Sequence, residues 1–393
     1  MTATEDVAPS RELRFLLACA RGEAVAVPAL DWRRLLWMAT RHRLTPQVAQ
    51  ALAGRPEVPA EVVATLARGT RQAAVTGLAQ AAEMVRVTTV LEAAGIPALA
   101  LKGPVEALLC RGGLGQRPSS DIDLHVAEEH IAGAIAALGQ AGWRPDLPGL
   151  AQVAGKPWVG AFECTLRRAA GAPAVELHWR FTSTFATFPL TMAEALGRSI
   201  AVELAGGSVR TLPTAERFLF LCAHGCKHGW AMVSHLLDIA VYLHRGIPPE
   251  IAGLARRMRL RRVLTLSVHL AHVLLAAPLP AWLPEAGPAD SRIRRLAGMT
   301  VAAMDLGPDE PDGWGGGGGR VRRLRYGWAL AEGPSGKLSL LHHLLPNEQD
   351  IAGGGGPLAL AAARFRRLAG WGWRRVLGGM PDPLSRPRHG PRP

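Results

Sequence analysis

The stretch at residues 96–126 constrains the fold more than any other part of the chain. Ile96 to Leu101 form an apolar run of strand length, and this run stops at Lys102 and Gly103. Pro104 follows at the first position of a predicted helix, where the missing N–H of proline costs no hydrogen bond. A glycine-rich break ends that helix and a second predicted strand follows, so the segment has a βαβ-like order.

The second strand of this segment carries two acidic residues. Asp121 and Asp123 flank Ile122, and alternation along a strand places both carboxylates on one face and Ile122 on the other. Two carboxylates this close repel each other unless a cation lies between them. Hard oxygen ligands of this kind suit Mg²⁺ or Mn²⁺. An Asp-x-Asp pair is also common on solvated strand faces, so its surroundings decide the interpretation.

Those surroundings resemble a known fold. The order of strand, glycine, helix and Asp-x-Asp strand looks like the nucleotidyltransferase fold of the DNA polymerase β superfamily. More narrowly, Leu-Lys-Gly at 101–103 and Arg-Pro-Ser-Ser-Asp-Ile-Asp-Leu at 117–124 resemble the bacterial family usually called uncharacterised nucleotidyltransferases, with similarity from about Asp31 to Trp373. The resemblance implies an α+β fold with a small mixed sheet, flanked by N-terminal and C-terminal helical regions. It also implies a transferase that uses Mg²⁺ or Mn²⁺ and takes an NTP as substrate.

A third carboxylate follows in the sequence Val-Glu-Leu-His-Trp. Residues 161–168 and 174–181 alternate like the two strands of a hairpin, and Glu176 shares a face with His178. In the superfamily a third acidic residue from a neighbouring strand completes the metal site, and the resemblance places Glu176 there, where many relatives have aspartate. Three roles stay open for His178: it orients Glu176, contacts a phosphate, or is a satisfied half-buried histidine.

A Cys/His cluster lies on the predicted helix that begins at Thr214. Cys222 and Cys226 lie on one stripe of that helix, whereas His224 and His228 lie about 200° away. The four side chains therefore cannot converge on one zinc ion while the helix is intact, and we exclude a zinc site.

The family resemblance gives this helix another role. The family sequence His-x-x-Lys-His-x-Trp matches residues 224–230 here. The match implies that this face closes the active site, with Lys227 and His228 facing the nucleotide phosphates. If the helix continues, Asp238 returns to nearly the same face as Lys227. The alternative is an ordinary solvated helix face.

The resemblance assigns further residues to the nucleotide. Phosphates would lie at the start of the helix after Gly103, where backbone N–H groups and the positive helix end meet them. Lys102 and Arg117 are candidates to stabilise the negative charge of the triphosphate. Ser120 is also a predicted nucleotide-binding residue. Arg117 is equally well explained as a structural partner of Asp121.

One residue departs from the superfamily pattern. The strand is usually followed by Gly-Ser or Gly-Gly, whose second residue contacts phosphate, but here Gly103 is followed by Pro104. Proline has no N–H to donate, which weakens the analogy for triphosphate binding and leaves room for lost activity.

Composition and the positions of glycine and proline divide the chain into six predicted segments. These are an N-terminal helical region at 1–90, a nucleotidyltransferase core at 91–212, a helical domain closing the active site at 213–284, a Gly/Pro-rich linker at 285–319, C-terminal helices at 320–380 and a basic disordered tail at 381–393. No residue of the N-terminal helices is predicted to act in catalysis or binding. We expect these helices to form one wall of a cleft. Residues 143–157 are expected to be irregular.

Composition excludes several classes of protein. With 48% apolar residues the chain is not intrinsically disordered. Five scattered cysteines indicate reduced thiols rather than a disulfide framework. Residues 1–10 lack the apolar run of a signal peptide, and the longest apolar stretch, 263–277, is too short to span a bilayer. We therefore expect a cytoplasmic protein without a membrane span.

The leading hypothesis is transfer of an NMP from an NTP to a hydroxyl of a peptide or small-molecule acceptor, with release of pyrophosphate. RNA tailing is an alternative that the net charge of +13 favours slightly, although no RNA-binding module is evident and the arginines are dispersed. A catalytically silent protein, either antitoxin-like or a scaffold, is the alternative from another class. The three carboxylates argue against it.

Overall fold

The computed structural model describes residues 9–24, 26–147, 162–169, 171–181, 188, 190–283, 290–308, 316–340, 362 and 365. The helical elements before and within the sheet region are α1 (Arg11–Arg21), α2 (Trp32–Arg41), α3 (Thr45–Leu52), α4 (Ala60–Ala93), α5 (Pro104–Arg111), η1 (Leu114–Gln116), η2 (Glu128–His130), α6 (Ile131–Gln140) and α8 (Met192–Arg198). The helices after the sheet are α9 (Thr214–Lys227), α10 (Val233–Arg245), α11 (Glu250–Arg257), α12 (Arg261–Leu275), α14 (Ser291–Met304), α15 (Gly316–Leu330) and α16 (Gly333–Ser339).

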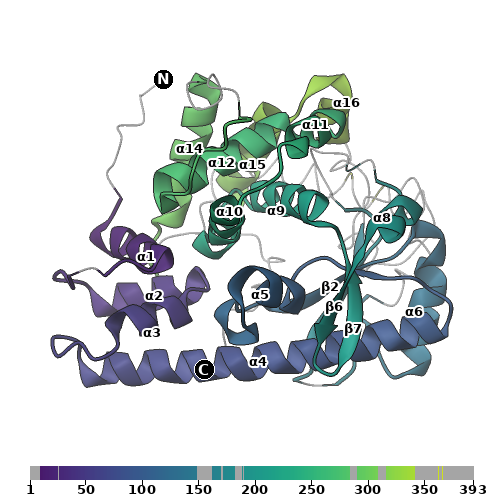
Figure 1. Cartoon of the computed structure of the whole chain (residues 1–393), viewed down its shortest axis with the longest axis horizontal. Helices are drawn as coiled ribbons and strands as arrows, with labels where there is room; N and C mark the ends of the chain where they lie inside the picture. Colours follow the sequence, from purple (N-terminus) through teal and green to yellow (C-terminus); the bar gives the residue numbers. More distant parts are fainter. Residues whose placement is uncertain are drawn as a thin grey trace.

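A seven-stranded mixed sheet lies at one end of the molecule, with most helices at the other (Figure 1). Its strands are β1 (Leu99–Ala100), β2 (Asp121–His125), β3 (Arg144–Pro145), β4 (Glu163–Arg167), β5 (Ala174–His178), β6 (Ile200–Leu204) and β7 (Gly207–Thr211), in the order β3-β4-β5-β2-β1-β7-β6. This arrangement confirms the predicted α+β fold with a small mixed sheet and flanking helical regions.

The pairing of the strands differs in one respect from a βαβ unit. β1 and β2, which α5 connects, are neighbours but run antiparallel. The parallel pairs are β2 with β5 and β1 with β7. The predicted hairpin is confirmed, because β4 and β5 pair antiparallel. The strand predicted over 96–101 is reduced to β1, although the Leu101 N–H still donates to the Asp123 carbonyl.

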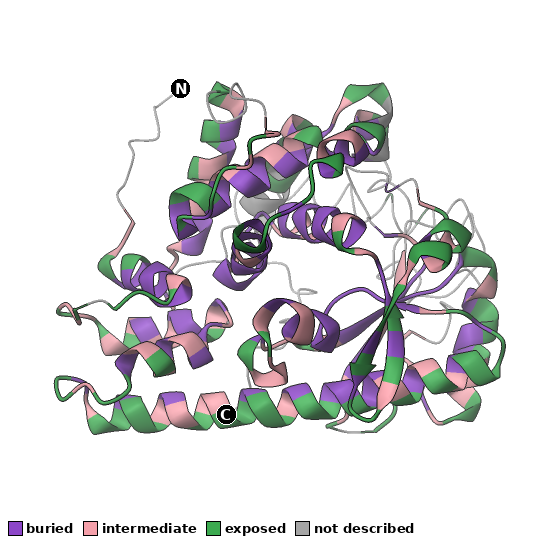
Figure 2. Cartoon of the chain, viewed as in Figure 1, coloured by how far each residue is buried: buried purple, intermediate pink, exposed green. Residues whose placement is uncertain are grey.

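The long helix α4 joins two apolar cores and runs beneath both parts of the molecule (Figure 1). Val62 and Leu66 in its first turns belong to the core of the helical part. Met84 and Leu91, in its second half, pack into the core beneath the sheet. The outward side of α4 is exposed along its length, as expected for an amphipathic helix (Figure 2).

Local sequence explains where several helices begin and end. The Asp31 carboxylate accepts a hydrogen bond from the Arg34 N–H and thereby caps α2. Ser10 caps α1 in the same way, and α1 ends at Gly22, whose φ of +72° suits glycine. Pro104 opens α5, as predicted.

Three expectations about secondary structure are corrected. Residues 144–145 form the short strand β3, whereas an irregular segment was expected. The hairpin of β6 and β7 has no counterpart in the sequence prediction. The helix that begins at Thr214 stops at Lys227 and does not continue to Asp238. A turn with positive φ at Gly229 and Trp230 separates it from α10.

The predicted segments compare unevenly with the described elements. All seven strands lie between Leu99 and Thr211, inside the range expected for the core, but the expected boundary at residue 90 falls within α4. The stretch at 285–319 was expected to be a linker, and residues 291–304 form α14 instead. The tail predicted at 381–393 lies outside the described residues. Across the part that is described, no helix combines the length and apolar character needed to cross a membrane.

Candidate active site

The register of β2 against β5 builds the site. These strands are parallel, with Asp123 opposite Glu176 and His125 opposite His178. Ile122 and Leu124 are fully buried in the core beneath the sheet, so the alternating acidic positions point to the other face. Glu176 therefore lies on the same face of the sheet as the one predicted for the Asp121 and Asp123 carboxylates.

Asp123 is the centre of the cluster. Its Oδ1 lies 2.6 Å from Lys102 Nζ and 3.1 Å from His178 Nε2. Its Oδ2 is buried and has no hydrogen-bond partner among the described residues. The side chain is only 1% exposed. One carboxylate oxygen is thus held in place, while the other is left without the compensation that a buried charge requires.

Three ligand-type side chains converge here. One potential ligand atom from each of Asp123, Glu176 and His178 lies within 4.8 Å of the others. The Glu176 Oε2 atom is 3.7 Å from His178 Nε2. Two carboxylates and an imidazole form a donor set that suits a divalent cation. The orphaned Oδ2 of Asp123 supplies a free ligand atom, so the residues present fit such an ion.

The pKa values reflect an excess of negative charge. Burial, together with the Asp121 and Asp123 carboxylates, raises the pKa of Glu176 to about 7. Burial also opposes ionisation of Asp123, but Lys102 and His178 outweigh it and hold the pKa of Asp123 below its ordinary value. Burial lowers the pKa of Lys102, and the Asp123 and Asp121 carboxylates more than reverse this, so its net shift is upward. Lys102 is therefore a cation bound within an anionic cluster.

Asp121 lies at the edge of the cluster, outside the group of converging ligand atoms. Its Oδ2 accepts a hydrogen bond of 2.9 Å from the Ser120 hydroxyl. Arg43 Nη2 in turn donates to the Ser120 hydroxyl over 3.0 Å. Ser120 thus links the predicted acidic pair to the turn after α2. Arg43 thus connects the N-terminal region to Ser120 beside the acidic pair.

The end of α9 brings Lys227 to the same site. Lys227 Nζ lies 3.7 Å from Glu163 Oε2 and 4.5 Å from the centroid of the Phe162 ring. Glu163 is also 3.4 Å from His178 Nδ1, because β4 places it directly opposite His178. Lys227 therefore lies beside Glu163 and His178, and its role toward nucleotide phosphates stays a prediction.

His228 lies in a group of three histidines beside Lys102. The ring of His224 is 4.6 Å from that of His228 and 5.0 Å from that of His235. His224 Nδ1 is 3.5 Å from Lys102 Nζ. Burial lowers the pKa of all three imidazoles well below 6.5, and nearby cations add to the effect, so these rings are neutral near pH 7. Among the described residues, Cys222, His224, Cys226 and His228 are not one of the groups whose ligand atoms converge.

Arg117 is not part of the carboxylate cluster. Its Nε donates to Asp238 Oδ2 over 2.8 Å, and both side chains are almost fully buried. Arg111 holds Oδ1 of the same aspartate at 2.8 Å. Asp238 was expected on the face of Lys227 if the helix continued. The break after α9 instead carries it to Arg117, which is thereby a structural residue without a bond to Asp121.

Gly103 and Pro104 form a tight turn between β1 and α5. Gly103 has φ +66° and ψ −128°, and a Cβ at this position would be 3.3 Å from the Asp121 carbonyl oxygen. Only glycine adopts this backbone comfortably. The turn thus holds Lys102 beside Asp123, while Pro104 offers no N–H at the helix start.

Sequence reasoning missed Glu163, Arg43 and His235. Glu163 opens a predicted strand, but its place opposite His178 depends on the hairpin register, which the sequence left open. Arg43 and His235 reach the site through long-range packing, and no local pattern marks them.

Comparisons with known proteins were consistent with this geometry. A family model described as uncharacterised nucleotidyltransferase matches residues 28–276, well over half of the chain. Searches of curated proteins and of solved structures each found no match.

Proposed function

Because the chain belongs to the uncharacterised nucleotidyltransferase family and is therefore a transferase, we propose that it moves an NMP from an NTP to a hydroxyl acceptor. The acceptor is a peptide or small molecule, and pyrophosphate is the second product. The proposal assigns metal binding to Asp121, Asp123 and Glu176, and nucleotide contacts to Lys102, Gly103, Ser120, Lys227 and His228.

The observation that carries the proposal is the buried, unpartnered Oδ2 of Asp123 opposite Glu176. A purely structural carboxylate at this depth would have both oxygens hydrogen-bonded. The raised pKa of Glu176 supports the same conclusion, since a divalent cation would remove the repulsion that causes it. Such a cation, when bound, supplies charge neutralisation for the triphosphate and lowers the pKa of the acceptor hydroxyl.

The remaining side chains position the substrate. Lys102 contacts Asp123 and Lys227 contacts Glu163, and these two ammonium groups balance the negative charge of a triphosphate. His178 hydrogen-bonds Asp123 and orients it toward Glu176. The catalytic contribution is mostly placement and electrostatics, as expected for phosphoryl chemistry.

The donor set favours Mn²⁺ at least as strongly as Mg²⁺. Mg²⁺ prefers oxygen ligands, whereas Mn²⁺ also accepts an imidazole nitrogen such as that of His178. We therefore include both ions in the test of the proposed activity.

The test uses the full chain, [α-³²P]NTPs, Mg²⁺ or Mn²⁺, and a fraction of bacterial peptides and metabolites. We expect label in an acceptor from α-labelled but not γ-labelled NTP, and none with the Asp121→Asn/Asp123→Asn variant. Asp146→Asn, which changes an exposed carboxylate paired with Arg167, is the matched control and should keep full activity. Equal transfer by the wild type and the double variant would contradict the proposal.

A further inference from the structure

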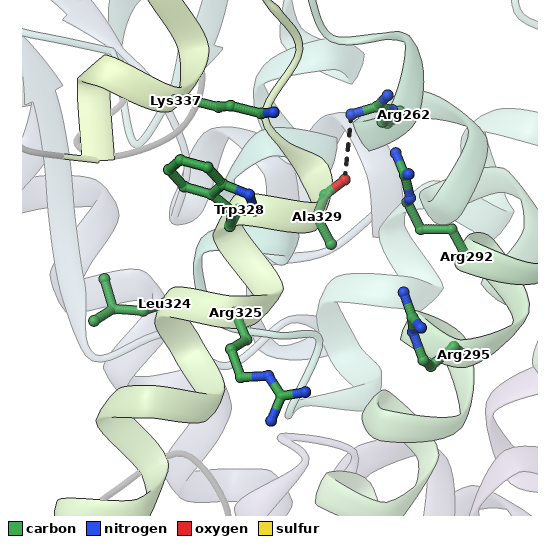
Figure 3. Close-up of a pocket in the computed structure, with 8 residues that line it drawn as sticks. All are labelled: Arg262, Arg292, Arg295, Leu324, Arg325, Trp328, Ala329 and Lys337. Carbon is green, nitrogen blue, oxygen red and sulfur yellow. Dashed lines mark hydrogen bonds between the residues drawn. The ribbon is translucent and has the colours of Figure 1, made fainter. Parts of the chain in front are cut away.

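A second charged cavity lies in the C-terminal helices. It has a volume of about 580 Å³ and is formed by α12, α14, α15 and α16 (Figure 3). All of its lining residues except Arg262 lie beyond residue 276, outside the range that the family model matches. The carboxylate cluster contributes no residue to it.

The lining of this cavity is strongly cationic. Four arginines and one lysine line it, and no acidic residue does: Arg262, Arg292, Arg295, Arg325 and Lys337. Figure 3 shows the guanidinium groups of Arg262, Arg292 and Arg295 on one side of the space and that of Arg325 lower in the view. These four side chains come from three helices. The side chains of Arg292, Arg295 and Arg325 form no ion pair with any residue that the structure describes. Neighbouring guanidinium groups repel one another, so an anion between them would stabilise the cluster.

The arrangement also has a rigid wall and an aromatic surface. Arg262 Nη1 donates to the Ala331 carbonyl over 2.8 Å, which fixes it at the end of α15. Trp328, on α15, is 53% exposed, which is unusual for such a large apolar ring. Lys337 Nζ lies 5.0 Å from the centroid of its ring. The cavity thus combines one held guanidinium group, further cations and an exposed indole that has Lys337 over one face of its ring.

We propose that this cavity binds a nucleoside polyphosphate at a second site separate from the carboxylate cluster. Guanidinium groups bind phosphate oxygens in pairs, and an indole stacks on a planar base. A volume of about 580 Å³ suits one nucleotide-sized ligand, whereas a nucleic-acid strand needs an extended groove.

The helix α15 lines the cavity and also lies near the histidine group. Tyr326 is 2% exposed and lies 3.5 Å from Thr300 on α14, so that face of α15 is packed inward. Arg323 is close enough to His228 to contribute to the lowering of its pKa. Arg325 and Trp328 line the cavity from other positions of the same helix. A nucleotide in the cavity would thus contact the helix that also approaches the histidine group.

The test measures binding of ATP and of inorganic triphosphate by calorimetry. It uses the full chain with Asp121→Asn/Asp123→Asn in EDTA, so that metal-dependent binding at the carboxylates is suppressed. We expect both ligands to bind at one site, with ATP tighter than inorganic triphosphate. Arg295→Glu should weaken both by about tenfold or more, because a charged hydrogen bond is lost and a repulsion is added. Trp328→Ala should weaken ATP about tenfold and leave inorganic triphosphate unchanged.

The matched control is Arg294→Glu, an exposed neighbour on α14 that does not line the cavity. It should change both affinities less than about twofold, since the same charge change occurs outside the site. Arg325→Glu serves as a second variant if Arg295→Glu alters thermal stability.

Equal weakening by Arg294→Glu and Arg295→Glu would overturn the proposal. So would displacement of ATP by an eight-nucleotide single strand at lower concentration than ATP itself. Because Asp121 and Asp123 are already replaced in this chain, neither result bears on the proposed transferase activity.

Discussion

Replacing Asp238 with asparagine tests whether Arg117 is a structural residue or a nucleotide ligand. Asp238 is fully buried and accepts bonds from Arg117 and Arg111, each at 2.8 Å. The substitution keeps the shape of the side chain and removes its charge. It therefore removes the one carboxylate that both buried guanidinium groups contact directly.

The expected loss is large because the partners are desolvated. Removing one member of a buried ion pair costs about 3–5 kcal/mol. Arg117→Met should cost less, about 1.5–3 kcal/mol, because Asp238 keeps its bond to Arg111. The double variant should lose less than the sum of the single variants, since both changes remove the same contact. The control pair Arg167 and Asp146 is half exposed, and Asp146→Asn should cost less than about 1 kcal/mol.

The assay is urea unfolding of the four variants, followed by binding of an NTP with Mn²⁺. We expect the Arg117→Met protein, once folded, to bind the nucleotide with unchanged affinity. The reasoning is refuted if Asp238→Asn is no more destabilising than Asp146→Asn. It is also refuted if Arg117→Met weakens nucleotide binding while the free energy of unfolding stays constant.

Three further predictions concern other positions. Burial lowers the pKa of His42 to about 3, so between pH 6.5 and that value only the unfolded chain protonates it. His42 therefore adds about 1.4 kcal/mol per pH unit to the fall in the free energy of unfolding below pH 6.5, and His42→Gln should reduce the slope measured in urea titrations by that amount. Gly103→Ala forces a strained backbone near the Asp121 carbonyl and should cost about 1–3 kcal/mol in thermal unfolding; an unchanged Tm would contradict this turn geometry. Gly225→Ala would place a Cβ 2.3 Å from the Trp230 ring, and should cost about 1–3 kcal/mol and shift the Trp230 environment in near-ultraviolet circular dichroism.

The sequence predicted the parts of the site that depend on local periodicity. Strand alternation correctly placed Ile122 in the core and Asp123 on the opposite face. The family resemblance placed Glu176 beside Asp123, and the parallel register of β2 and β5 puts it there. The assignment of these residues to metal binding stays a prediction.

What the sequence did not predict depends on tertiary packing. The segment after Lys227 is compatible with a continuous helix, yet the chain turns at Gly229. The turn is fixed by the Trp230 ring, which occupies the space where Gly225 has no side chain, and by the Trp230 N–H bond to the Gly225 carbonyl. The direction of the chain after this turn places Asp238 beside Arg117, although the two residues are 121 positions apart in the sequence. No local pattern encodes such a pairing.

Titration of Mn²⁺ followed by electron paramagnetic resonance tests the central claim most directly, because it measures metal binding without requiring the acceptor. The wild-type chain should bind Mn²⁺ in the presence of an NTP, and Asp123→Asn and Glu176→Gln should each lower the affinity by about tenfold or more, while Asp146→Asn leaves it unchanged. The same Mn²⁺ affinity in the wild type, Asp123→Asn and Glu176→Gln would contradict the account.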